Sequence, residues 1–82
     1  MANITVYIRY QDKKEDFACP PDIVLGDLLD QIAARGEMLT AGTVYEAFAG
    51  NSEKQLDQNR SLEELGIKDG DVIDVASRGM AG

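Results

Sequence analysis

The chain contains no histidine, no tryptophan and only one cysteine among its 82 residues. Without histidine it cannot assemble a catalytic triad of serine, histidine and aspartate, and one cysteine cannot supply the ligands of a zinc site. No glycine-rich loop carries a phosphate-binding lysine. We expect Cys19 to be a buried structural thiol, because no histidine is present to activate it as a nucleophile. The sequence therefore predicts a protein that is not an enzyme.

Basic residues are also scarce: 8 lysines and arginines stand against 15 aspartates and glutamates, which gives a net charge of −7. The acidic residues are spread along the chain, so nucleic acid and anionic membranes are poor partners. A partner with a basic docking groove would encounter this surface faster. The sequence begins with neither a signal-peptide pattern nor a long apolar run, which predicts a cytoplasmic protein with no membrane contact.

The first half of the chain predicts a hairpin followed by a helix. Residues 4–10 alternate strictly between apolar and polar, as in a strand with one buried face. Residues 11–16 form a polar connector, and residues 17–19 resume an extended segment. Apolar residues then recur at helical spacing over 22–35, with Asp22 as the expected N-terminal cap. Gly26 within this helix implies either close backbone packing or a loose helix start.

The second half predicts further strands. Residues 43–49 are β-prone in either of two phases: Val44 and Phe48 face the core, or Tyr45, Ala47 and Ala49 do. A short strand is expected around Leu56 and a capping box over 61–64. Asp69 and Asp71 lack the spacing of a calcium loop, so residues 68–71 are read as a tight turn with no metal. A last strand over 72–75 completes an α+β pattern, with one amphipathic helix on a mixed sheet.

The second half also resembles ubiquitin. The matching residues are Phe48-Ala49-Gly50, Lys54-Gln55-Leu56-Asp57, Arg60-Ser61-Leu62, Gly66-Ile67 and Asp69-Gly70-Asp71-Val72-Ile73. From Lys54 onward the chain aligns with ubiquitin without a gap, so that Gly82 falls on its final glycine, while residues 51–53 resemble an insertion. The resemblance implies a ubiquitin-like β-grasp fold, with a domain over 1–76 and a flexible C-terminal tail over 77–82.

Ubiquitin-like modifiers act through their C-terminus, so the resemblance implies a function for the tail. An activating enzyme uses ATP and magnesium to adenylate the terminal carboxylate, which finally forms an isopeptide bond with a target amine. The corresponding tail residues here are Arg78, Gly79, Met80, Ala81 and Gly82. Ala81 replaces a glycine and Met80 an arginine, so an enzyme tuned to ubiquitin should handle this tail poorly. An enzyme from a bacterial ubiquitin-like conjugation system is expected to accept it; the alternative is an end with no chemistry.

The same resemblance assigns partners and a surface. A covalent modifier needs an activating enzyme, a conjugating enzyme and a deconjugating protease, and Lys54 lies where ubiquitin has a chain-forming lysine. The apolar recognition patch of ubiquitin falls on Ala47 and Ala76, so its ordinary receptors should not bind this chain. Other exposed residues expected on this face are Tyr7, Arg9 and Tyr45, and an aromatic–arginine cluster is typical of binding hot spots.

Two other functions remain open at this point. One is a non-covalent adaptor, similar to the ubiquitin-like accessory proteins of type VII secretion, which needs no tail. The other is a sulfur carrier that forms a thiocarboxylate at Gly82, against which Ala81 counts because such carriers typically end in two glycines. A monomer is expected in each case, although an uncovered edge strand could pair with a second copy. We rank the covalent modifier first and the sulfur carrier last.

Overall fold

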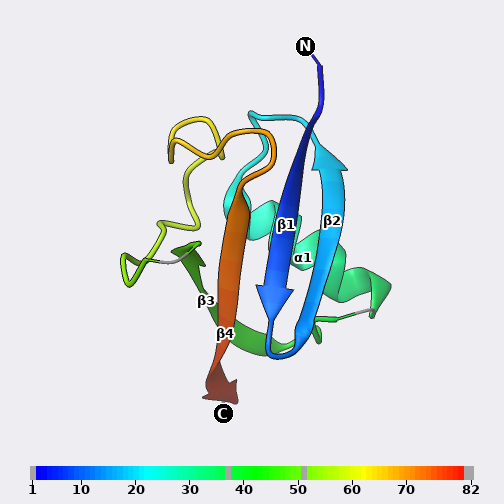
Figure 1. Ribbon diagram of the computed structural model, residues 1–82. Coiled ribbons are helices and arrows are strands. Elements are labelled where there is room, and N and C mark those ends of the chain that lie inside the picture. Colours follow the sequence, from blue (N-terminus) through cyan, green and yellow to red (C-terminus); the bar gives the residue numbers. More distant parts are fainter. Residues whose placement is uncertain (1, 37, 51, 81–82) are drawn as a thin grey trace.

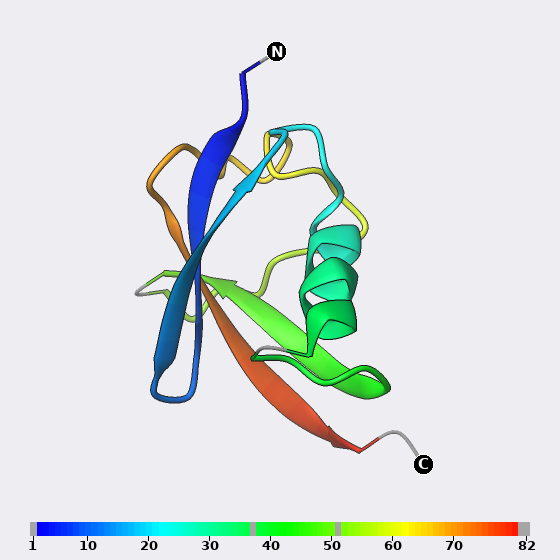
Figure 2. The same ribbon diagram turned by 90° about the vertical axis from the view of Figure 1, so that its right-hand side faces the viewer.

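The computed structural model describes residues 2–36, 38–50 and 52–80. A four-stranded sheet and one helix make up the fold: β1 (Ile4–Tyr10), β2 (Lys13–Cys19), α1 (Leu25–Arg35), β3 (Thr43–Ala49) and β4 (Val72–Met80). The strand order is β2-β1-β4-β3 (Figure 1). The central β1 and β4 are parallel and the two outer pairs are antiparallel. The expected α+β class is confirmed, with α1 packed across one face of a mixed sheet (Figure 2).

The N-terminal hairpin is confirmed, but it is longer than predicted. Its strands pair from Ile4 with Cys19 to Tyr10 with Lys13, so only residues 11 and 12 form the turn. Gln11 takes a positive φ of 56° there. The expectation of a connector over 11–16 was wrong, because residues 13–16 are all exposed and carry no apolar signal that could reveal a strand.

The core lies between α1 and the sheet face that it covers. Amphipathic spacing places four buried side chains of the helix on this face: Leu25, Leu28, Leu29 and Ile32. The sheet contributes the alternate residues of its strands: Val6, Ile8, Phe17, Cys19, Ala47, Ile73 and Val75. The connections close the ends of this layer with Met38, Leu39, Leu56, Leu62 and Ile67. One small core therefore serves the whole described domain.

The start of α1 differs from the prediction. The helix begins after Val24, and no side chain caps it, so Asp22 is not its cap. Backbone carbonyls from a distant segment accept the free helical N–H groups instead: Leu25 N donates to Arg60 O, and Gly26 N to Gln58 O, each at 2.9 Å. A Cβ on Gly26 would lie 3.0 Å from that Gln58 oxygen. Gly26 is thus explained by close backbone packing.

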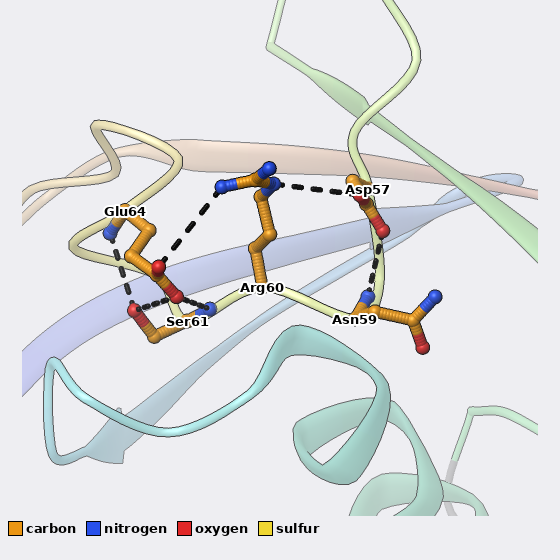
Figure 3. A network of polar contacts seen from close by, with 5 residues as sticks. All are labelled: Asp57, Asn59, Arg60, Ser61 and Glu64. Carbon is orange, nitrogen blue, oxygen red and sulfur yellow. Dashed lines mark hydrogen bonds and ion pairs between the residues drawn. The ribbon is translucent and has the colours of Figure 1, made fainter.

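The segment that supplies these carbonyls is ordered by the predicted capping box (Figure 3). Ser61 N donates to Glu64 Oε1 at 3.0 Å, and Glu64 N donates back to Ser61 Oγ at 3.2 Å. These bonds lower the pKa of the Glu64 carboxyl below its usual range. Arg60 lies between Asp57 and Glu64. The capping box is confirmed, although it organises turns in place of a short helix.

Three strand predictions are settled by the sheet. Ala47 is fully buried, whereas Val44 is 43% exposed, so β3 adopts the phase in which Tyr45, Ala47 and Ala49 face the core. Around Leu56 there is only an isolated bridge between Phe48 and Gln55, and no strand. The last strand does not end at residue 75: β4 continues to Met80, and its end pairs with β3 from Ser77–Tyr45 to Met80–Thr43.

Candidate protein-docking face

The outer face of the sheet, which points away from α1, is the strongest candidate for a functional surface. Side chains alternate along each strand, so the residues between the core positions point outward. The outer face includes Lys14 and Asp16 of β2, Tyr7 and Arg9 of β1, Val72, Asp74, Ala76 and Arg78 of β4, and Glu46 and Phe48 of β3. Figure 2 shows that no other element covers this face within the described residues.

An apolar group lies at the β3–β4 side of this face. Phe48 is paired with Asp74 across the strands, which makes Val72 and Ala76 its diagonal neighbours. We call Phe48, Val72 and Ala76 the outer patch. Phe48 is half-buried and does not pack against the core, so its ring contributes to the surface.

Ion pairs frame the outer patch. The guanidinium of Arg9 binds the carboxylate of Asp74 through two hydrogen bonds, of which Nη2 to Oδ2 measures 2.9 Å. This contact raises the pKa of Arg9 above its ordinary value. On the other side Arg78 Nε lies 3.2 Å from Glu46 Oε1. These pairs fix the positions of the charged groups beside Phe48.

The outer face carries no net charge. Its three cationic side chains, Arg9, Lys14 and Arg78, balance its three carboxylates, Asp16, Glu46 and Asp74. The net charge of −7 therefore comes from the rest of the chain. Lys14 Nζ lies 5.1 Å from the ring centre of Tyr7, at cation–π distance. A neutral face with an apolar group at its β3–β4 side is better suited to burial than the acidic surface around it.

The predicted surface is only partly on this face. Tyr7, Arg9 and Ala76 belong to it, but Ala47 is in the core and cannot contact a partner. Tyr45 also lies on the core side, where its ring meets that of Tyr10 at 5.4 Å in a T-shaped pair. Its hydroxyl accepts a hydrogen bond from Thr40 N at 2.8 Å. These two assignments were wrong because they depended on the unresolved phase of β3.

Phe48 was missed by the sequence-based site prediction. Alignment with ubiquitin placed the recognition position on Ala47, whereas the strand register gives the outward position beside Asp74 to Phe48. The available signal was the alternation of Val44, Glu46 and Phe48, which is typical of a strand face exposed to solvent. That signal was ambiguous, because both faces of β3 contain apolar residues.

The residues predicted for the tail divide into two groups. Arg78, Gly79 and Met80 belong to the end of β4, and the side chain of Arg78 is 69% exposed despite its ion pair. Ala81 and Gly82 lie outside the described residues. The division into a domain over 1–76 and a tail over 77–82 thus does not match the strand bounds, since β4 extends to Met80 and its residues Ser77 and Met80 pair with Tyr45 and Thr43.

The two remaining predicted residues are placed simply. Lys54 is exposed, and its role as an acceptor stays a prediction. Cys19 is buried, as expected, and burial raises the pKa of its thiol.

Over residues 2–36, 38–50 and 52–80, no group of three or more potential ligands could hold a metal ion. Among the described residues, no helix is long and apolar enough to span a membrane.

Within the described residues, the mixed sheet order and the helix that crosses one of its faces define a ubiquitin-like β-grasp fold. Similarity to solved structures agrees with this. A ubiquitin-like domain of an Arabidopsis thaliana protein superposes with a TM-score of 0.77 at 20% identity, covering 98% of this chain and 82% of that one. Ubiquitin of Caldiarchaeum subterraneum gives 0.75 at 17% identity, over 99% and 100% of the two chains.

A third similar structure comes from an enzyme. A chain of phenol hydroxylase from Pseudomonas sp. OX1 gives a TM-score of 0.77 at 18% identity, covering 95% of this chain and 75% of that one. No family model and no curated protein sequence matches the chain. The structural similarities therefore define the fold.

Proposed function

We propose that this chain is a ubiquitin-like protein-binding module that docks a partner protein on the outer patch. The observation that carries the proposal is the position of Phe48, an aromatic ring on a solvent-facing strand position that is not used by the core. Aromatic residues and arginines are enriched in protein interfaces, where they often serve as anchors. The ion pairs of Arg9 and Arg78 place an arginine on either side of the patch.

The chemistry of the surface suggests what the partner presents. An apolar side chain would pack against Phe48 and Ala76, while polar groups would meet the Arg9–Asp74 pair. Because the net charge of −7 comes from the rest of the chain, basic residues around the partner's contact site would accelerate association without entering the centre of the interface.

Site-specific photo-crosslinking in the cells that express the protein tests this proposal. A benzophenone amino acid would replace Phe48 in one variant and the exposed helix residue Asp27 in a control variant. We expect a discrete crosslinked protein from position 48 that is competed away by an excess of wild-type chain. Crosslinking from position 27 alone would contradict the proposal, because α1 lies on the opposite side of the sheet.

The second candidate function is covalent conjugation through the carboxylate of Gly82. The match of residues 77–82 to the tail of ubiquitin favours it. The extent of β4 also favours it. This strand continues to Met80, beyond its last pair with β1, which joins Tyr10 and Val75. An activating enzyme would use ATP and magnesium, a conjugating enzyme would transfer the chain to a target amine, and a protease would reverse the step. This function requires Gly82 to be the last residue of the mature protein.

Intact mass spectrometry tests this candidate. The protein would be incubated with ATP, magnesium and the activating-type enzyme encoded nearest its gene, beside a variant that lacks Gly82. A thiol-labile adduct that requires Gly82 would demonstrate activation of the carboxylate. A mass gain of one sulfur in place of one oxygen would identify a thiocarboxylate carrier. No adduct with an enzyme shown to be active would exclude both covalent functions and leave non-covalent binding.

A further inference from the structure

The two edges of the sheet differ in their protection. The edge of β3 is covered by residues 54–58: Leu56 N donates to Ala47 O at 2.7 Å, and the side-chain amide of Gln58 donates to Tyr45 O at 2.7 Å. In the described part of the chain, no segment pairs with the outer edge of β2 (Figure 1). An unpaired strand edge of seven residues is a template for another strand.

The exposed half of this edge carries charged side chains that form no ion pair within the described residues. Lys13, Lys14, Glu15 and Asp16 follow one another along β2, and all four are exposed. Lys14 and Asp16 point to the outer face, and Lys13 and Glu15 point to the helix side, because Phe17 and Cys19 are in the core.

A groove of about 320 Å³ runs beside the same edge, between β2 and α1. Its floor includes Phe17, Leu28 and Ile32, and its rim includes the charged residues Glu15 and Arg35. Such a groove suits a long side chain with an aliphatic stem and a charged end. Lysine has this character.

We propose that two copies of this chain pair through the edges of their β2 strands, antiparallel and about a twofold axis, to join two sheets into one. A twofold axis perpendicular to the sheet keeps both outer faces on the same side, so outward residues meet outward residues. With Glu15 on the axis, Lys14 of each copy lies opposite Asp16 of the other. The interface then contains two matched cross-strand charge pairs on the outer face.

The helix side fits the same register. Lys13 of each copy lies opposite Phe17 of the other, at the groove between β2 and α1, with Glu15 of the other copy as its diagonal neighbour. The two Glu15 carboxylates approach each other at the axis, and both Lys13 ammonium groups lie close enough to offset this repulsion. Edge lysines usually prevent pairing, but in this arrangement each is matched by a carboxylate of the second copy.

Neighbouring registers are less favourable, which defines the alignment. Moving the axis by half a residue toward Asp16 is excluded, because it would place outward residues opposite helix-side residues. Moving it by a full residue toward Asp16 places Glu15 opposite Phe17 and Lys14 opposite Ala18, so no opposite charges are matched. Moving it by a full residue toward Lys14 pairs Lys13 with Glu15, but it places Asp12 opposite Asp16 twice, in addition to the two Lys14 side chains at the axis. Like charges directly opposite destabilise a strand pair. The interface is short, so the dimer is expected to be weak and to form with rising concentration.

Sedimentation velocity over about 10 µM to about 1 mM tests the proposal with the full chain. We expect the wild type to shift from the 8.9 kDa monomer toward a dimer as concentration rises. Lys14→Glu and Asp16→Lys should each remain monomeric over this range. Mixing these two variants in equal amounts should restore association, because each copy then supplies the charge that the other needs.

Two matched variants control for net charge. Lys54→Glu and Asp27→Lys alter the charge by the same amounts at exposed positions away from β2, and both should dimerise like the wild type. Circular dichroism would establish that every variant is folded. A wild type that stays monomeric at all concentrations would overturn the proposal and leave the edge to a strand from another protein. A dimer that survives both β2 charge reversals would also overturn it.

Discussion

Replacing Gly26 by alanine at the start of α1 has two effects of opposite sign on the stability of the protein. In a helix interior alanine is more favourable than glycine by about 1 kcal/mol, which predicts stabilisation. The new Cβ, however, would lie 3.0 Å from the carbonyl oxygen of Gln58, closer than an ordinary van der Waals contact. That oxygen also accepts the N–H of residue 26 at 2.9 Å, so moving it away lengthens a hydrogen bond.

The close contact with the Gln58 oxygen should cost more stability than the higher helix propensity of alanine adds. The Gln58 carbonyl cannot retreat freely, because the Gln58 side chain is bound to Tyr45 O and the neighbouring Arg60 carbonyl is bound to Leu25 N. Overpacking of this kind costs about 1–3 kcal/mol. A cost of about 2 kcal/mol less a gain of about 1 leaves a net destabilisation of about 1 kcal/mol. For a domain of this size the melting temperature would fall by about 4–8 °C.

Urea unfolding followed by circular dichroism measures the effect, with Ala34→Gly as the matched control. Ala34 is exposed on the same helix, so its replacement tests propensity alone and should cost about 0.5–1 kcal/mol. Alanine should therefore be the better residue at position 34 and the worse residue at position 26. A Gly26→Ala variant that is more stable than the wild type would refute the view that residues 58–60 cap and fix the helix start.

Further predictions test the capping box and the phase of β3. Ser61→Ala should lower the free energy of unfolding by about 1 kcal/mol in a urea titration, because it removes a capping hydroxyl. The pKa of Glu64 is lower in the folded state than in the unfolded state, so its contribution is complete above the unfolded value of about 4.3 and is lost as pH falls through the folded one. The free energy of unfolding, measured with urea at a series of pH values, should therefore fall less steeply toward acidic pH in Glu64→Gln than in the wild type. The same steepness in both proteins would count against the pairing of Glu64 with Ser61. Ala47→Asp should cost more than about 3 kcal/mol because it buries a carboxylate, whereas Phe48→Thr should cost only about 1 kcal/mol; similar losses would contradict the observed phase.

Local patterns in the sequence predicted the elements whose causes are local. Strict alternation identified β1, and the spacing of serine and glutamate identified the capping box at Ser61 and Glu64. A glycine between two aspartates identified the turn at Gly70, where φ is 87°. In each case the residues that determine the structure lie within a few positions of one another.

The errors arose where distant segments decide the outcome. The cap of α1 comes from carbonyls more than thirty residues away, which no pattern around Asp22 could reveal. Residues 13–16 form a strand because they pair with β1, although they contribute no buried side chain. The two faces of β3 are similarly apolar, so only its register with β4 determined that Phe48, and not Ala47, reaches the surface. The main residue of the candidate site therefore required the structure.

The most direct test of the account is the affinity of the crosslinked partner for purified variants, measured by isothermal titration calorimetry. Phe48→Thr keeps a residue of high β-propensity on the strand and removes the aromatic ring of the outer patch. The account predicts that it weakens binding by about tenfold or more, as the loss of an aromatic anchor does. Asp27→Lys, which changes the helix side, should bind within about twofold of the wild type. Equal affinities of Phe48→Thr and the wild type would contradict the assignment of the outer patch as the docking surface.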